Sequence, residues 1–175
     1  MNNYIKSACA LQAELDGCGG LLPRLSIDHR NTIVPLDVFD ELVTDKQLKR
    51  IVEKLFRDGH HARAVEEAFK FIDNLVKRLS KQNNLSGASL MTKAFSADRP
   101  LLRLNTGQSV SEQDEQKGYM QILAGCMTGI RNPRAHECDW EDSEKRAIEM
   151  LAWANHLIER IRLAAKTTDT SLDPT

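Results

Sequence analysis

Apolar residues recur at helical spacing through most of the chain that follows Thr44, and this pattern limits the fold more than any other feature. Stripes of this kind lie at residues 48–56, 65–79, 120–130 and 148–161. Because residues three and four apart share one face of an α-helix, each stripe predicts an amphipathic helix whose apolar face lies in a common core. The sequence therefore predicts an all-α bundle of four to five helices.

Local signals predict where these helices begin and end. Capping boxes at Thr44–Gln47 and at Ser109–Glu112 each predict a helix start. Gly59 predicts the end of the first of these helices, because glycine adopts the left-handed cap conformation at little cost. The last helix is expected to end near Ala165.

Three segments follow from these limits. Residues 1–42 are predicted to be an N-terminal arm, partly helical, in which an amphipathic pattern at residues 3–15 is followed by glycines and prolines. Residues 43–166 hold the stripes and form the predicted helical domain. Residues 167–175 are predicted to be a disordered tail.

Composition limits the class of protein further. No apolar run approaches the roughly 18 residues of a membrane span, so we expect no membrane partner. The four cysteines are scattered and form no C-x-x-C pair, which predicts neither disulfides nor a zinc site. The same cysteine pattern makes a reducing cytoplasm the expected location, and the start of the chain does not have the basic and apolar pattern of a signal peptide. No metal and no cofactor are expected.

Charge is spread unevenly, although the net charge is only −1. Residues 46–136 carry 16 basic and 9 acidic side chains, whereas both ends are acidic. A polyanion could dock locally on the middle of the chain. Solvated helix faces without any ligand explain the same pattern.

The hexapeptide RNPRAH at residues 131–136 is predicted to form a tight turn between two helices. Pro133 has no N–H and therefore suits the first position of a helical turn, and Asn132 before it is a good N-cap. The preceding helix is expected to end near Arg131. That helix contains Gly118, Gly125 and Gly129, which predict a close backbone approach to another helix or to a second copy of the chain.

The side chains of this hexapeptide suit phosphate chemistry. The planar guanidinium of Arg131 can hold a phosphate, and the imidazole of His136 can move a proton near pH 7. Arg134 is expected beside the same phosphate, as an RNA-binding residue. A helix cap at Asn132 and a structural histidine would explain these residues without any ligand.

Several motifs occur in order along the chain, and together they carry a resemblance to a known family. They are Asp58-Gly59-His60-His61 with Ala64-Val65-Glu66-Glu67-Ala68-Phe69, Ser89-Leu90-Met91 with Ala94-Phe95-Ser96, Gly118-Tyr119-Met120 through Ala124-Gly125, and Arg131-Asn132-Pro133-Arg134-Ala135-His136-Glu137. Over about residues 44–164 the chain resembles the Ymh-like family of the HEPN superfamily.

This resemblance implies a HEPN-like helical bundle that forms a two-fold dimer. The superfamily signature is an arginine, a polar residue after it and a histidine beyond a gap of four to six residues, and Arg131, Asn132 and His136 match it as catalytic residues. Many members are metal-independent endoribonucleases of toxin–antitoxin, abortive-infection and CRISPR-linked defence systems. The resemblance thus implies a phage-defence or toxin-type enzyme that acts on RNA, with an antitoxin or other defence-system protein as a further partner.

The implied reaction is cleavage of single-stranded RNA by attack of the 2′-hydroxyl. His136 would take the proton from that hydroxyl or donate one to the leaving 5′-oxygen, and Arg131 would stabilise charge on the phosphorane-like transition state. The alternative is a non-catalytic HEPN module that binds RNA, a nucleotide or a protein partner. A third interpretation is a scaffold in which the turn only joins two helices.

Overall fold

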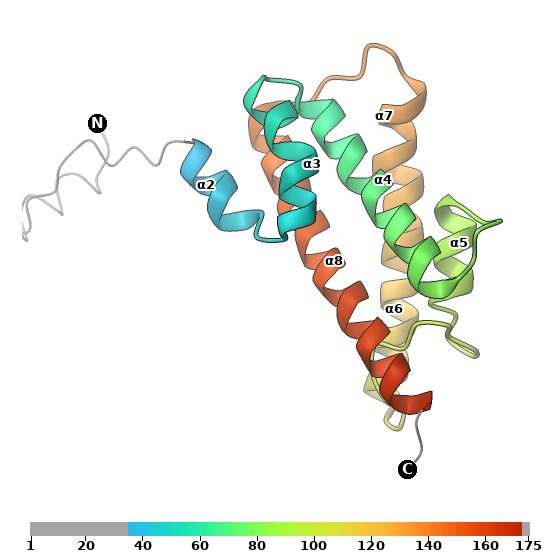
Figure 1. Ribbon diagram of the computed structural model, residues 1–175. Coiled ribbons are helices and arrows are strands. Elements are labelled where there is room, and N and C mark those ends of the chain that lie inside the picture. Colours follow the sequence, from blue (N-terminus) through green and yellow to red (C-terminus); the bar gives the residue numbers. More distant parts are fainter. Residues whose placement is uncertain (1–34, 173–175) are drawn as a thin grey trace, which may run out of the picture. The chain divides into compact units, whose positions relative to one another are not determined.

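Helices make up most of the described part of the chain, which is residues 35–172 of the computed structural model and contains no strand (Figure 1). They are α2 (Pro35–Leu42), α3 (Lys46–Arg57), α4 (His61–Ser80), α5 (Gly87–Ala94), α6 (Val110–Cys126), the π-helical η1 (Met127–Arg131), α7 (Asn132–His136) and α8 (Glu144–Leu172). The predicted all-α class is confirmed. The helix predicted at residues 3–15 lies outside the described residues.

Helix α4 is the central element of the core. It packs against α3 and α8, and it also contacts α5, η1 and α7. Figure 1 shows α4 and α8 side by side. The stripes predicted at residues 65–79 and 148–161 supply much of the core, including the fully buried side chains of Phe69, Ile72 and Leu151. Burial of these apolar side chains is the main force that holds the helices together.

Helix α2 belongs to this bundle, although it lies within the predicted N-terminal arm. It packs against α8, and its Phe39 side chain is fully buried. The Phe39 ring stacks on that of Phe56 in α3, with 4.9 Å between the ring centroids. The bundle therefore begins before residue 43, and the rest of the predicted arm, residues 1–34, lies outside the described part.

The two predicted capping boxes have different outcomes. Ser109 and Glu112 form the predicted reciprocal box at the start of α6. At the start of α3 the N-cap is Asp45 rather than Thr44, because the Asp45 carboxylate accepts the N–H groups of Gln47 and Leu48 at 3.0 and 2.9 Å. The prediction that Thr44 caps this helix is therefore wrong by one residue, because the carboxylate of the neighbouring Asp45 caps it instead.

Asn155 of α8 joins the start of α3 to the bundle. Its Oδ1 accepts the backbone N–H groups of Thr44 and Asp45 at 3.0 and 2.8 Å, and its Nδ2 donates to Thr44 Oγ1 and to Glu159 Oε1. These bonds satisfy backbone donors that the α3 helix leaves unpaired. No local pattern in the sequence predicted this contact, because its partners lie more than a hundred residues apart.

We expect Asn155→Ala to lower the free energy of unfolding by about 1–3 kcal/mol, since it leaves two backbone donors without their acceptor. Urea unfolding followed by circular dichroism measures the change. The matched control is Glu159→Ala, which removes an exposed neighbour of the same network and should cost less than about 0.5 kcal/mol. Equal losses in the two variants would contradict the role of Asn155.

Helix α8 continues beyond its expected end near Ala165 and reaches Leu172. The hydroxyls of Thr167 and Thr168 donate to the carbonyls one turn earlier, and Thr168 Oγ1 also accepts the N–H of Arg103 at 2.9 Å. The predicted disordered tail is thus helical in its first part, because a contact with a distant loop outweighs its polar composition. Residues 173–175 lie outside the described part.

None of the described helices is long and apolar enough to cross a membrane.

Candidate active site

The predicted turn at residues 131–136 is the end of one continuous helix. The chain passes from α6 through η1 into α7 without leaving the right-handed helical region, and Asn132 itself has φ −63° and ψ −43°. The N–H of Asn132 donates to the carbonyl of Met127, five residues earlier, which is a π-helical bond. The prediction of a helix end at Arg131 with Asn132 as N-cap is therefore wrong.

The π-helical turn lies directly before Pro133. In a regular α-helix the proline ring would clash with the carbonyl four residues earlier, that of Gly129, and would leave this carbonyl without a donor. The wider turn of η1 moves the backbone at this point, and the helix continues past the proline. Single π-helical turns inside α-helices are frequent at functional sites.

Arg131, the last residue of η1, keeps most of its donors free. Its Nη1 donates to Asn132 Oδ1 at 3.2 Å, while its Nε is enclosed and has no partner among the described residues. The side chain as a whole is half-buried. A guanidinium that is held near the backbone and retains free donors suits an anionic ligand.

His136 ends α7 with its side chain exposed. In the part of the chain that the structure describes, this side chain makes no hydrogen bond and no ion pair. His136 follows Asn132 by four residues, so the two share a helical face. Arg131 lies five residues before His136 and is therefore rotated from it by about 140° around the helix. One chain thus brings the amide and the imidazole together but does not bring the guanidinium to the same face.

A small pocket of about 280 Å³ lies between α4 and the segment that includes His136. It is lined by Arg63 and Glu66 of α4 and by His136, Cys138 and Trp140. Figure 1 shows that α7 ends at the end of the bundle where α4 begins. The sequence did not single out Trp140 for this site, because nothing local in the sequence relates Trp140 to α4.

Glu66 places a carboxylate in the wall of this pocket. Burial raises the pKa of Glu66, but the hydrogen bonds and charges of Lys70 and Arg63 outweigh this effect, so that the net pKa is lowered. Lys70 Nζ and Arg63 Nη1 lie 2.8 and 2.7 Å from its two oxygens. Glu66 is therefore an ionised group beside His136 at neutral pH.

Arg134 is enclosed in the protein and forms a clamp with Asp142. Its Nε and Nη2 lie 2.6 and 2.8 Å from the two carboxylate oxygens, and its Nη1 donates to the carbonyl of Ile130 at 2.7 Å. Only 2% of the Arg134 side chain and none of the Asp142 side chain is exposed. The guanidinium also lies over the Trp140 ring, 5.4 Å from its centroid.

This clamp assigns a structural role to Arg134, since its donors are occupied and its side chain is enclosed. The pair closes the loop that follows His136 and fixes it to the end of α6–α7. A contact between Arg134 and RNA, as predicted, would require the pair with Asp142 to open. Of the four predicted site residues, Arg131, Asn132 and His136 therefore retain groups that a ligand could reach.

The helix glycines do not make the close contact that they predicted within the chain. A Cβ added at Gly118, Gly125 or Gly129 would meet no atom within 4 Å. The alternative, an approach to a second copy of the chain, stays a prediction. The exposed side of α6 also carries Ile122, which is 38% exposed, and α8 carries Trp153, which is 37% exposed.

Ile122 and Trp153 lie on adjoining faces of α6 and α8. Tyr119, one turn before Ile122, has its Oη 2.8 Å from Nε2 of His156. The His156 ring in turn stacks on that of Trp153, with 5.3 Å between the centroids. Gly118, Gly125 and Gly129 lie four residues before, three after and seven after Ile122, so they share its helical face. The glycines, Ile122 and Trp153 thus form one exposed surface with small and apolar side chains, which we call the α6–α8 face.

Metal ligands are not grouped in the described residues: no three His, Cys, Asp or Glu side chains there could hold one metal ion.

The fold and the site together define an all-α protein with an Arg, Asn and His group at a π-helical turn. The chain belongs to the Hypoth_Ymh family, whose family model, described as "Protein of unknown function (Hypoth_ymh)", matches residues 43–161. The match therefore includes all three of these residues. The chain matches no curated protein and no solved structure.

Proposed function

We propose that this protein is a metal-independent endoribonuclease of the HEPN type that cleaves single-stranded RNA at a site shared by two chains. The observation that carries the proposal is that Arg131 and His136 lie close together in the sequence and have polar groups available for a ligand. Both lie within six residues at the end of one helix, and both keep polar groups without partners among the described residues. Unpaired donors and a free imidazole are what acid–base chemistry at a phosphate requires.

In the proposed reaction the RNA 2′-hydroxyl attacks the adjacent phosphorus. His136 takes the hydroxyl proton, and the bond from phosphorus to the 5′-oxygen breaks as a water molecule donates a proton to that oxygen. Arg131 stabilises the negative charge of the transition state through its paired N–H donors. Asn132, which accepts from Arg131, orients that guanidinium. The products are a 2′,3′-cyclic phosphate and a 5′-hydroxyl.

The dimer that this mechanism needs is supported by the α6–α8 face. The face lies on the helix that ends in Arg131 and His136, and its glycines leave room for a second backbone. Its exposed Ile122 and Trp153 supply apolar surface, which drives association in water. A two-fold axis that passes close to the end of this helix would bring the two copies of that end together. The role in phage defence or as a toxin, and an antitoxin partner, rest on the resemblance to HEPN proteins.

The wild-type protein is expected to cleave single-stranded RNA in the presence of EDTA, because none of the proposed groups needs a metal ion. The measurement is gel electrophoresis of end-labelled RNA together with analysis of the product ends. His136→Ala protein, purified in the same way, controls for contaminating nucleases and should leave the RNA intact. Cleavage of equal strength in both preparations, or products with a 5′-phosphate, would refute the proposed reaction.

The second candidate is a non-catalytic module that binds RNA, a nucleotide or a protein partner at the same site. The observation that favours it is the rotation of about 140° between Arg131 and His136, which separates the two groups in a single chain. Binding of RNA that Arg131→Ala weakens, without cleavage by the wild type, would support this candidate over the nuclease.

A further inference from the structure

Four exposed cations without an ion pair to the described residues lie on α5, on the loop that follows it and on α6. Lys93 and Arg99 line an open hollow of about 870 Å³, and Arg103 and Lys117 line another of about 650 Å³. Asp98 lines both, so the two hollows adjoin. Among the described residues, none of the four cations forms an ion pair. We call this surface the α5–α6 face.

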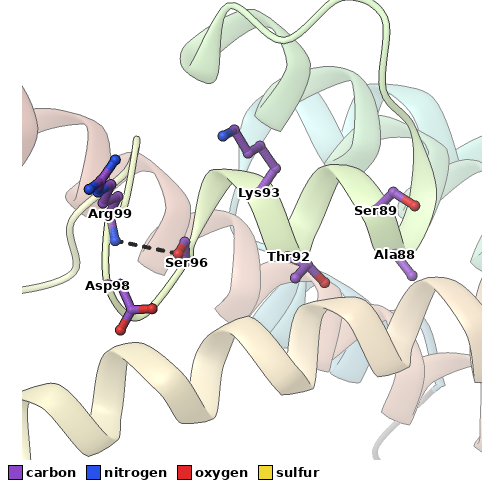
Figure 2. A pocket seen from close by; sticks show the side chains of 7 residues that line it. All are labelled: Ala88, Ser89, Thr92, Lys93, Ser96, Asp98 and Arg99. Atoms are coloured by element: carbon purple, nitrogen blue, oxygen red, sulfur yellow. Dashed lines mark hydrogen bonds between the residues drawn. The ribbon is translucent and has the colours of Figure 1, made fainter.

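Hydroxyl groups accompany the cations on the exposed side of α5. Ala88, Thr92 and Ser96 follow one another at intervals of four residues, and Ser89 and Lys93 do so one position further on. Ala88 with Thr92 and Ser89 with Lys93 therefore lie on adjacent faces of α5, whereas Ser96 lies beyond the end of this helix at Ala94. Figure 2 shows the five residues along the hollow. The hydroxyls of Ser89 and Thr92 make no hydrogen bond to the described residues. Helical hydroxyls often bond to a carbonyl of the preceding turn, so these two remain available to a ligand.

The α5–α6 face leads toward the candidate active site. Gln116 Nε2, near the start of α6, donates to the carbonyl of Phe95 at the end of α5, at 3.1 Å. Helix α5 also contacts η1, which ends in Arg131. Figure 2 shows α6 passing below the hollow, from the side of Asp98 to the side of Ala88. The array of cations and hydroxyls therefore extends from the start of α6 toward η1.

We propose that the α5–α6 face binds the phosphate backbone of single-stranded RNA and leads the strand to Arg131. The inference rests on the proposed function, because it names how that site holds its substrate. The lining of the two hollows contains four cations and only two carboxylates, those of Asp98 and Asp114, so it has a net positive charge. The array is elongated, which suits a chain of phosphates better than one compact anion. No aromatic side chain lines either hollow, so the face contacts the backbone and does not stack on bases.

The test measures the binding of a fluorescein-labelled 2′-O-methyl oligoribonucleotide, which cannot undergo attack by a 2′-hydroxyl. Two double variants, Lys93→Ala with Arg99→Ala and Arg103→Ala with Lys117→Ala, should each weaken binding by on the order of tenfold at low salt. Each should also make the slope of log K against log salt less steep by about 1.4, for two lost phosphate contacts. Thermal unfolding should be unchanged, because these side chains have no charged partners to lose.

The matched control is Lys46→Ala with Arg50→Ala, which removes the same charge from exposed positions of α3. Helix α3 packs against α4 and α8, away from the α5–α6 face. Equal weakening by the control would overturn the proposal, since only net charge would then matter. The proposal would also be overturned if polyglutamate or duplex RNA bound more tightly than single-stranded RNA, because the α5–α6 face would then suit a different ligand.

These results also separate the inference from the proposed nuclease. Binding that depends on the four cations, in a protein that does not cleave RNA, would support the docking face and reject the nuclease. Cleavage by the wild type with binding unaffected in both double variants would support the nuclease and reject the docking face.

Discussion

Two inactive variants of the chain are expected to restore RNA cleavage when they are combined in one dimer. Arg131→Ala and His136→Ala should each lower the cleavage rate by at least ~10² on their own, because each removes a group that acts in the transition state. A dimer with one chain of each kind should regain one intact Arg–His pair out of two. Its rate should therefore be about half that of the wild-type dimer.

The physical reason is the helix geometry at the end of α6–α7. Arg131 and His136 are five residues apart on a continuous helix, so their side chains leave it in directions about 140° apart. If the guanidinium of one chain pairs with the imidazole of the other, the mixed dimer contains one pair with both groups and one with neither. If both groups acted within one chain, each chain of the mixed dimer would lack one of them and no activity would return.

The measurement needs the mixed dimer in pure form. Co-expression of the two variants with different affinity tags, followed by two successive purifications, isolates it. Dimers of each variant with itself, carrying the same two tags, are the controls and should stay inactive. A stable mixed dimer without activity would contradict pairing between chains, and full activity of either single variant would contradict the assigned role of its residue.

Helix periodicity predicted the bundle well, because burial of an apolar stripe depends on local spacing. The stripes at residues 65–79 and 148–161 lie in α4 and α8, and the Ser109 box begins α6. The contribution of α2 was not predicted, since Phe39 is buried only through its contacts with distant helices. The glycines and prolines of the arm predicted an irregular segment, and this prediction does not hold for α2.

Pro133 shows why the candidate site was predicted in the wrong local structure. Proline after a good capping residue is typical of a helix start, and the rule holds when the preceding turn is α-helical. Here η1 widens the helix just before the proline, and the chain continues without a break. The sequence identified Arg131, Asn132 and His136 as candidates, but a π-helical turn depends on packing that the sequence pattern does not reveal.

The role of Arg134 depended on a partner eight residues further on, in a loop without a regular pattern. From the sequence alone, a second arginine beside Arg131 suggests another phosphate contact. The structure pairs it with Asp142, whose carboxylate is fully buried. An arginine in such a pair has little freedom to meet a ligand, so the charge of a residue predicts its function only when its neighbours are known.

Breaking this clamp is expected to have the largest effect on stability of any change described for the chain. Arg134→Ala or Asp142→Ala should each lower the free energy of unfolding by about 3–5 kcal/mol, because the first leaves the buried Asp142 with only an exposed arginine and the second leaves the buried Arg134 without a carboxylate. Urea unfolding followed by circular dichroism gives the loss as a lower midpoint with an unchanged slope. Cleavage activity should fall with it, because the clamp fixes the segment that begins at His136.

Arg146 provides the matched control for this experiment. Its Nε lies 3.4 Å from the same Asp142 carboxylate, but 53% of its side chain is exposed. Arg146→Ala should therefore cost no more than about 1 kcal/mol, since solvent screens exposed pairs. The double variant Arg134→Met with Asp142→Leu should recover most of the stability, because it removes both charges and fills the space with apolar atoms. Equal losses for Arg134→Ala and Arg146→Ala would show that burial is not what makes the clamp strong.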